Sequence, residues 1–231
     1  MEFVNRENGI FRTLNRLAEC VDFVVVGGYV VSGSGQHRFS VDCDVVIPKK
    51  GLSQTEAVLE RYGYEKDVEK KGFDETYAGE FIRYKKKVGA LPVTFGLLVE
   101  SLVCRNTGAS WSFDYIKKQA VETNIGGIEA SAKCKVPQKE LMIAFKIHSA
   151  RRTDVRDIVM LLENSDLKKV LTHLRRGNID MLKKQVNRII MMLNDERLID
   201  SLKGVFTLTV DVRKRIADAK EKMAFLQKAL D

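Results

Sequence analysis

The sequence predicts an α/β (α+β) protein, in which an N-terminal half forms a sheet with helices and a C-terminal half forms a helical bundle. Two observations support this division. Before residue 137, short β-branched runs end at glycine or proline, which is typical of strands and turns. After Pro137, proline is absent, glycine is rare and apolar residues recur every three or four positions, as in amphipathic helices. We therefore expect two domains, residues 1–136 and 137–231.

Individual elements follow from the same patterns. The run of valines before Gly27-Gly28 predicts a buried strand and a tight turn, and Pro48 closes the next strand. Gly126-Gly127 separates two further runs, which predicts a hairpin. The predicted strands cover roughly residues 23–26, 41–47, 79–85, 91–99, 120–125 and 128–136. The predicted helices cover roughly residues 6–20, 54–62, 138–163, 166–176, 179–193 and 211–229.

Charge is distributed unevenly along the chain. Residues 1–135 hold 19 Lys+Arg against 18 Asp+Glu, whereas residues 136–231 hold 20 against 13, out of a net charge of +8. A polyanion such as nucleic acid, or the triphosphate of a nucleotide, fits such a basic half, and a solvated helical surface is the alternative.

Other bulk features narrow the class of protein. No apolar run approaches the roughly 20 residues that span a bilayer, and the acidic start lacks a basic leader, so we expect a soluble cytoplasmic protein without a membrane partner. The four cysteines form no Cys-x-x-Cys pair, which argues against a zinc site or a disulfide framework.

Two acidic residues stand inside the second predicted strand. Asp42 and Asp44 are one residue apart, directly before Val45-Val46-Ile47. Alternate residues of a strand point to the same face, so each carboxylate raises the cost of ionising the other unless a cation lies between them. Carboxylate oxygens suit Mg²⁺, or Mn²⁺ in its place. The pattern therefore predicts a divalent-metal site, with a pair of exposed acids on an edge strand as the alternative.

These residues belong to a longer pattern. Val26-Gly27-Gly28, followed by Arg38-x-Ser40-x-Asp42-x-Asp44, resembles the signature of the nucleotidyltransferase superfamily with a polymerase-β-like core. Lys146, followed by Arg151-Arg152-x-Asp154-x-x-Asp157 on one predicted helix, resembles the AbiEii-type branch, which contains the toxins of toxin–antitoxin systems. The resemblance implies a small mixed sheet flanked by helices, followed by the helical bundle.

The residues have roles that suit this chemistry. Asp42 and Asp44 would hold the metal, and the backbone at Gly27 and Gly28 would approach phosphate oxygens. Ser40 shares the metal-facing side of its strand, and Arg38 is a second phosphate ligand or a solvated loop residue. On the predicted helix, Lys146 would act as a catalytic point charge toward the nucleotide. The remaining nucleotide-binding candidates, which would orient it or pair locally, are Arg151, Asp154 and Asp157, with a helix laced by surface ion pairs as the alternative.

The predicted activity is metal-dependent transfer of a nucleoside monophosphate from an NTP to a hydroxyl acceptor. The basic half favours RNA, including tRNA, as the acceptor, with a protein side chain as the alternative, and the resemblance alone implies an antitoxin protein as a partner. One difference from the family pattern argues against an enzymatic function. Gly96 stands where the family has a third carboxylate, and Glu80 or Glu100 would have to supply that carboxylate instead.

Two other functions therefore stay open. One is a degenerate protein of the same fold that binds a nucleotide or nucleic acid without turnover. The other is a basic helical nucleic-acid-binding protein whose sheet is only a scaffold. Trp111 offers a surface for base stacking but is expected to pack over the sheet, and the three histidines lack a second ligand at metal spacing.

Overall fold

The computed structural model describes residues 2–32, 40, 42–72, 74, 76–206 and 211–230. The chain divides into two compact units. The sheet unit comprises Met1–Val103 and Ser110–Pro137, and the helical unit comprises Cys104–Ala109 and Gln138–Asp231. The short segment Cys104–Ala109 thus belongs with the helices, although strands flank it in the sequence.

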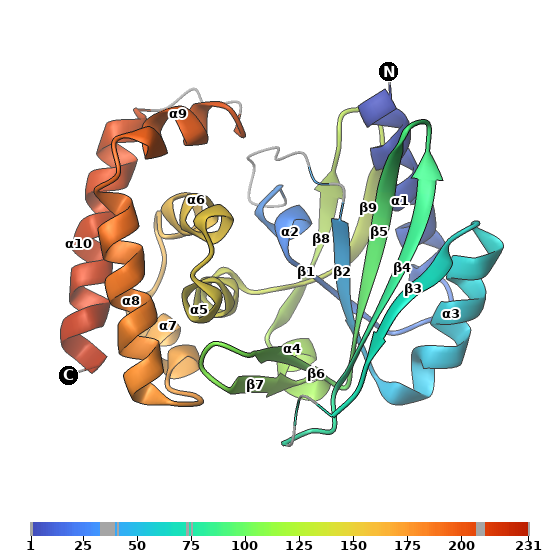
Figure 1. Cartoon of the computed structure of the whole chain (residues 1–231), viewed down its shortest axis with the longest axis horizontal. Helices are drawn as coiled ribbons and strands as arrows, with labels where there is room; N and C mark the ends of the chain where they lie inside the picture. Colours follow the sequence, from blue (N-terminus) through green and yellow to red (C-terminus); the bar gives the residue numbers. More distant parts are fainter. Residues whose placement is uncertain are drawn as a thin grey trace. The chain divides into compact units, whose positions relative to one another are not determined.

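A five-stranded mixed sheet forms the centre of the sheet unit, with the strand order β1-β2-β5-β4-β3 (Figure 1). Its strands are β1 (Val24–Val26), β2 (Asp42–Ile47), β3 (Glu65–Lys70), β4 (Glu80–Val88) and β5 (Leu91–Val99). Strands β2 and β5 run parallel, and the other neighbouring pairs are antiparallel. The predicted fold class, a small mixed sheet with flanking helices and further helices at the C-terminal end, is confirmed.

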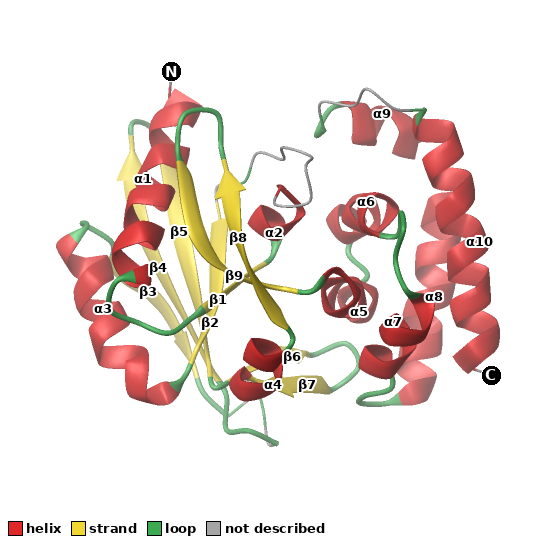
Figure 2. Cartoon of the chain, turned by 180° about the vertical axis from the view of Figure 1, so that it is seen from behind, coloured by secondary structure: helices red, strands yellow, loops and turns green. Residues whose placement is uncertain are grey.

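Helices α1 (Glu2–Ala18) and α3 (Leu52–Arg61) cover one face of this sheet (Figure 2). On this helix-covered face, the Tyr84 hydroxyl of β4 donates a hydrogen bond to Glu56 of α3 at 2.8 Å. The residues of β2 that point to it have no exposed surface: Cys43, Val45 and Ile47. Asp42 and Asp44 alternate with them and therefore point to the other side, which we call the aspartate face.

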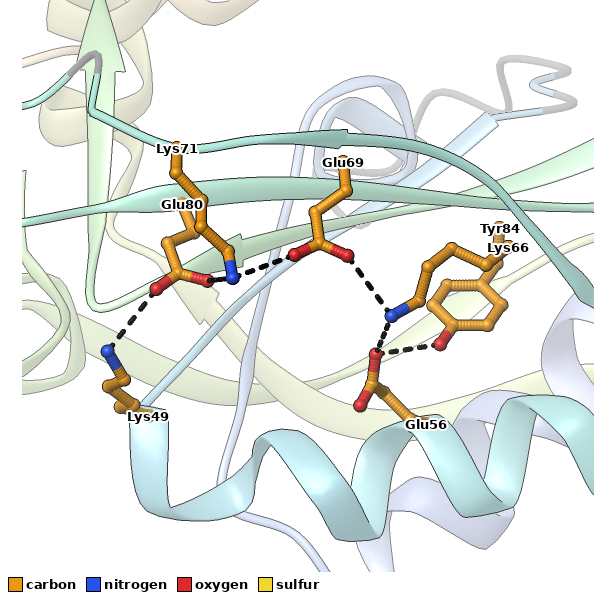
Figure 3. Close-up of polar contacts among 7 residues, drawn as sticks. All are labelled: Lys49, Glu56, Lys66, Glu69, Lys71, Glu80 and Tyr84. Atoms are coloured by element: carbon orange, nitrogen blue, oxygen red, sulfur yellow. Dashed lines mark hydrogen bonds and ion pairs between the residues drawn. The ribbon is translucent and has the colours of Figure 1, made fainter.

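The sequence pattern does not predict β3, because five of its six residues are charged. The strand lies at the edge of the sheet, where charged side chains prevent pairing with another chain. A chain of alternating charges joins it to its neighbours on the helix-covered face (Figure 3). The charged members are Lys49, Glu80, Lys71, Glu69, Lys66 and Glu56, and the Tyr84 hydroxyl is hydrogen-bonded to Glu56 at the end of the chain. Exposed pairs of this kind contribute about 1 kcal/mol or less each, so the network mainly fixes the position of the edge strand.

Shorter elements complete the sheet unit. Helix α2 (Gly28–Ser32) follows β1, the short helix η1 (Lys49–Gly51) precedes α3, and α4 (Phe113–Lys118) leads into the predicted hairpin. The hairpin consists of β8 (Ala120–Gly126) and β9 (Ser131–Pro137), and β9 packs against α1 and β1. A second hairpin pairs β6 (Ser101–Cys104) with β7 (Ala109–Ser112). Trp111 in β7 is fully buried, as expected for a packing role and not for base stacking.

The helical unit contains more breaks than the pattern predicts. Its helices are α5 (Lys139–Ser149), α6 (Arg152–Leu161), α7 (Leu167–Leu174), α8 (Ile179–Leu193), α9 (Arg197–Lys203) and α10 (Val212–Leu230). The prediction of one helix over residues 138–163 is wrong, because Ala150 adopts a left-handed conformation (φ 47°) that ends α5. The side chain of Asp154 then accepts a hydrogen bond from the backbone N–H of Arg151 at 3.1 Å and caps the start of α6. No helix in the described ranges is both long and apolar enough to cross a membrane.

Contacts of Thr107 explain why the segment before β7 belongs to the helical unit. Its hydroxyl lies 2.7 Å from Nδ1 of the buried His148 on α5, and its carbonyl oxygen accepts a hydrogen bond from the N–H of Asn178 at 2.7 Å. Gly177 lies so close to this carbonyl that an added Cβ would stand 2.4 Å from the oxygen. The turn between α7 and α8 therefore requires glycine at this position.

Candidate active site

The aspartate face brings together residues from β1, β2 and β5. In the register of the sheet, Asp44 is paired with Val26 of β1 on one side and with Gly96 of β5 on the other. Asp42 is paired with Thr94. Paired residues of adjacent strands point to the same face, so these side chains form neighbouring rows on one surface.

Two glycines make room for the carboxylate of Asp44. Gly27, directly after β1, has φ +84°, a conformation that favours glycine, and a Cβ there would lie 3.2 Å from Oδ2 of Asp44. A Cβ at Gly96 would lie only 2.2 Å from Oδ1 of Asp44 and 3.3 Å from the ring of Phe81. The carboxylate of Asp44 thus occupies the space between two glycines, beside the Gly27-Gly28 bend. A side chain at residue 96 would therefore displace the carboxylate of Asp44 from this position.

Thr94 holds the second carboxylate. Its hydroxyl donates a hydrogen bond of 2.6 Å to Oδ1 of Asp42, whose side chain is exposed at the start of β2. No local sequence pattern singles out Thr94, because only the pairing of β2 with β5 places it beside Asp42. A hydrogen bond to a metal-binding carboxylate restricts its orientation, which is a common supporting contact at metal sites.

The residues before β2 are described only in part. The Ser40 hydroxyl donates a hydrogen bond to the backbone carbonyl of Asp42 at 3.0 Å, and the Ser40 carbonyl accepts one from the Tyr29 hydroxyl at 2.5 Å. These contacts connect α2 to the start of β2. Arg38 lies outside the described residues, and its role as a phosphate ligand stays a prediction.

Neither of the suggested replacements for a third carboxylate lies beside Asp44. Glu80 is paired in register with Val99, on the helix-covered face, and forms ion pairs with Lys49 and Lys71. Glu100 follows the last residue of β5, and its side chain accepts a hydrogen bond from the backbone N–H of Lys49. Within the described part of the chain, no three acidic, histidine or cysteine side chains are grouped as metal ligands. The donor set on the aspartate face is a pair of carboxylates, which fits Mg²⁺ or Mn²⁺ with waters and phosphate oxygens as the remaining ligands.

The other predicted residues form a buried cluster in the helical unit. Nζ of Lys146 lies 2.9 Å from Oδ1 of Asp154 and 2.7 Å from Oδ2 of Asp157, and all three side chains are buried. Arg151, whose side chain is 68% exposed, donates from Nε to Oδ2 of Asp154 at 2.9 Å. Two cations thus balance two carboxylates. Burial alone would raise the pKa of Asp154, but Lys146 and Arg151 lower it to about 2.

This cluster places the charge of Lys146 between two carboxylates inside the helical unit. An ammonium group has three N–H donors, and two of them are accounted for by Asp154 and Asp157. Arg151 is the member of the cluster with substantial exposure. Lys146 is thus enclosed by its two partners, whereas Arg151 is largely exposed to solvent.

Two cations on the aspartate face were not predicted as part of the site. Arg83 of β4 is paired with Gly96, and Lys85 is paired with Thr94. They extend the two rows that begin at Asp44 and Asp42. Only the order of the strands reveals this, because Asp42 and Arg83 are 41 positions apart in the sequence and the β4 segment has the pattern of an ordinary charged strand.

Comparisons with known proteins bear on the fold. The chain is similar to a crystal structure designated a "putative nucleotidyltransferase" from H. pylori, with a TM-score of 0.50, 17% identity, and coverage of 98% of this chain and 95% of that one. It is also similar to the crystal structure of JHP933 from Helicobacter pylori, with a TM-score of 0.51, 16% identity, and coverage of 99% and 93%. No protein-family model and no curated protein sequence matches the chain. At these identities the chain shares its fold with the two structures over nearly the whole length of each.

Proposed function

We propose that the chain is a metal-dependent nucleotidyltransferase, which transfers a nucleoside monophosphate from an NTP to a hydroxyl acceptor. The observation that carries the proposal is the position of Asp44, whose carboxylate lies between Gly27 and Gly96 with Asp42 on the same face. The fold shared with a structure designated a nucleotidyltransferase is consistent with it.

The residues on and near the two aspartates have separate roles in this proposal. Asp42 and Asp44 supply the carboxylate oxygens for Mg²⁺ or Mn²⁺, and Thr94 fixes the orientation of Asp42. A bound divalent cation would neutralise charge on the triphosphate and favour ionisation of the attacking hydroxyl. Gly27 and Gly28 allow phosphate oxygens to approach the backbone, with Ser40 and Arg38 as further phosphate ligands.

Arg151 of the helical unit is a further nucleotide-binding candidate in this proposal, as the sequence resemblance implies. Its guanidinium is oriented by Asp154, and Lys146 keeps Asp154 and Asp157 in place by compensating their charge. This assigns Lys146 a supporting function, whereas the sequence pattern predicts direct contact with the nucleotide.

The acceptor and the partner follow from weaker observations. The excess of seven positive charges in residues 136–231 favours RNA, including tRNA, over a protein side chain as the acceptor. A toxin-like role, with an antitoxin protein as partner, is proposed from the sequence resemblance alone.

A protein that binds a nucleotide without turnover is the second candidate function. It is favoured by one observation. Residue 96, where the family places a third carboxylate, is glycine, and the side chains of Asp44 and Phe81 fill the space beside it. Without a further acid, the attacking hydroxyl would have to lose its proton to water or to one of the two aspartates.

Incubation of the full chain with each α-labelled NTP, total RNA, and Mg²⁺ or Mn²⁺ separates these functions. Transfer of label that is lost in Asp42→Asn and Asp44→Asn, but retained in Asp114→Asn on α4, would support the enzyme. Asp114 is an exposed acid of the same unit and controls for the loss of one negative charge. Binding of an NTP without transfer under either metal would support the second candidate, and absence of NTP binding would contradict both.

A further inference from the structure

The aspartate face carries charges of both signs, separated by two small residues. Arg83 and Lys85 on β4 lie in the same rows as Asp44 and Asp42, with Gly96 and Thr94 of β5 between them. Adjacent strands are about 4.8 Å apart, so the cations start about 10 Å from the aspartates. A ligand that extends from β5 over β4 can therefore contact both sets of charges.

Asp67 of β3 holds the two cations in place. Its Oδ2 accepts hydrogen bonds from Nε and Nη2 of Arg83 at 2.9 and 2.6 Å, and its Oδ1 accepts one from Lys85 at 2.6 Å. Lys85 and Arg83 together lower the pKa of Asp67. Asp67 is 19% exposed, whereas Arg83 and Lys85 are 44% and 52% exposed. The carboxylate thus orients both cations from the β3 side of β4, the side away from β5, and both remain accessible to solvent.

Positive charge is in excess on this part of the face. The register and contacts of β3 and β4 place four cations and two carboxylates here, namely Lys70, Arg83, Lys85, Lys87, Glu65 and Asp67. One carboxylate is already shared between Arg83 and Lys85. The remaining positive charge suits a partner with several negative charges.

The geometry of in-line attack gives this surface a role, and this step rests on the proposed function. In phosphoryl-group transfer the attacking and leaving oxygens are roughly in line on opposite sides of the phosphorus. The Gly27-Gly28 bend lies on the β1 side of Asp44 and would receive the triphosphate, including the leaving pyrophosphate. The acceptor then approaches from the opposite side, over β4 and across Gly96 and Thr94 of β5, so that it passes Arg83 and Lys85.

We propose that Arg83 and Lys85, oriented by Asp67, bind the acceptor, and that the acceptor is a nucleic acid whose backbone phosphates contact them. A terminal hydroxyl oxygen of the acceptor forms a bond to the α-phosphorus of the NTP. The bond from this phosphorus to the bridging oxygen of the β-phosphate breaks, pyrophosphate leaves with the electron pair, and the hydroxyl proton passes to water. Arg83 and Lys85 take no part in the bond exchange and fix the position of the incoming strand.

The test measures the affinity of the full chain for a fluorescent single-stranded RNA, by anisotropy, at several salt concentrations. The variant Arg83→Ala/Lys85→Ala is compared with Arg12→Ala/Lys50→Ala, which removes two exposed cations from α1 and from the turn before α3. We expect the first pair to weaken binding about tenfold and to reduce the slope of log affinity against log salt by about 1 to 2, and the control pair to change little. Lys85→Ala alone should reduce the slope by about 0.7, which keeps the test valid if the double variant is poorly folded.

A second arm separates this inference from the proposed function. NTP affinity in the presence of Mg²⁺ should be unchanged in Arg83→Ala/Lys85→Ala and weakened in Asp44→Asn. The KM for RNA in label transfer should rise in Arg83→Ala/Lys85→Ala relative to the parent and to Arg12→Ala/Lys50→Ala, whereas Asp44→Asn should lose transfer. Equal losses of RNA affinity in the two double variants would overturn the inference, as would an unchanged KM for RNA. Transfer of label to protein with none to RNA would overturn the choice of nucleic acid, while the proposed transferase function would stand.

Discussion

Substitution of Gly96 by alanine tests the geometry of the aspartate face most specifically. The new Cβ would stand 2.2 Å from Oδ1 of Asp44, so this oxygen must move by about 1 Å to reach an ordinary contact distance. A carboxylate at the end of a side chain can rotate away, so the fold should survive, with a loss of about 1 kcal/mol from crowding against Phe81. The metal site cannot compensate as easily, because a displaced carboxylate no longer meets the cation. Perturbations of this size at metal sites reduce affinity about 10- to 100-fold.

The assay is a titration with Mn²⁺ followed by electron paramagnetic resonance, with thermal unfolding measured on the same samples. Gly126→Ala in β8 is the matched control, since nothing lies within 4 Å of an added Cβ there and its backbone is not left-handed. Gly96→Ala should lose affinity for Mn²⁺ while its melting temperature stays within a few degrees of the parent, and Gly126→Ala should retain both. An unchanged Mn²⁺ affinity in Gly96→Ala would refute the assignment of Asp44 as a metal ligand beside β5.

Three further changes have defined outcomes. Thr94→Val removes the hydrogen bond to Asp42 and should lower Mn²⁺ affinity about tenfold with little change in the free energy of unfolding. A loss of Mn²⁺ affinity that comes with a similar loss of unfolding free energy would indicate that Thr94 has a structural role only. Gly177→Ala should lower the free energy of urea unfolding by roughly 1 to 3 kcal/mol, because the added Cβ would lie 2.4 Å from the Thr107 carbonyl oxygen. A Gly177→Ala protein as stable as the parent would contradict this contact. Burial lowers the pKa of His148 to about 4, so its contribution to stability is present above its unfolded pKa of about 6.5 and is lost as the pH falls toward 4. Between pH 7 and pH 5 the free energy of unfolding of the parent protein should therefore fall by about 2 kcal/mol more than that of His148→Gln. Equal decreases in the two proteins would show that the imidazole is not held neutral.

The central part of the fold could be predicted from the sequence because local patterns determine it. Strand β2 combines an apolar run with two acids at alternate positions, and alternation alone places Asp42 and Asp44 on one face. Glycine at the end of β1 also marks the bend beside them, although only the structure shows that the carboxylate of Asp44 lies against it.

Features that depend on pairing between distant segments could not be predicted in this way. Thr94 and Arg83 acquire a connection to the aspartates only through the order of strands β2, β5 and β4, which no local pattern encodes. The sequence pattern does not predict strand β3, because an edge strand needs few apolar residues and its charges mask the alternation.

The helical unit shows a different limit of sequence patterns. The periodicity of apolar residues runs from α5 into α6 without a glycine or proline, yet Ala150 adopts a left-handed conformation and breaks the helix. This break turns α6 so that Asp154 and Asp157 meet Lys146 inside the unit. A continuous helix would have suggested a row of charges on the surface, which the burial of these three residues contradicts.

The most direct test of a cation held by Asp42 and Asp44 is the binding of Mn²⁺ in the presence of a non-hydrolysable NTP analogue, observed by electron paramagnetic resonance. The proposed site predicts a bound Mn²⁺ signal that the nucleotide strengthens and that disappears in Asp44→Asn while the protein stays folded. A signal of the same strength in Asp44→Asn, or no bound Mn²⁺ in the parent chain with nucleotide present, would contradict it.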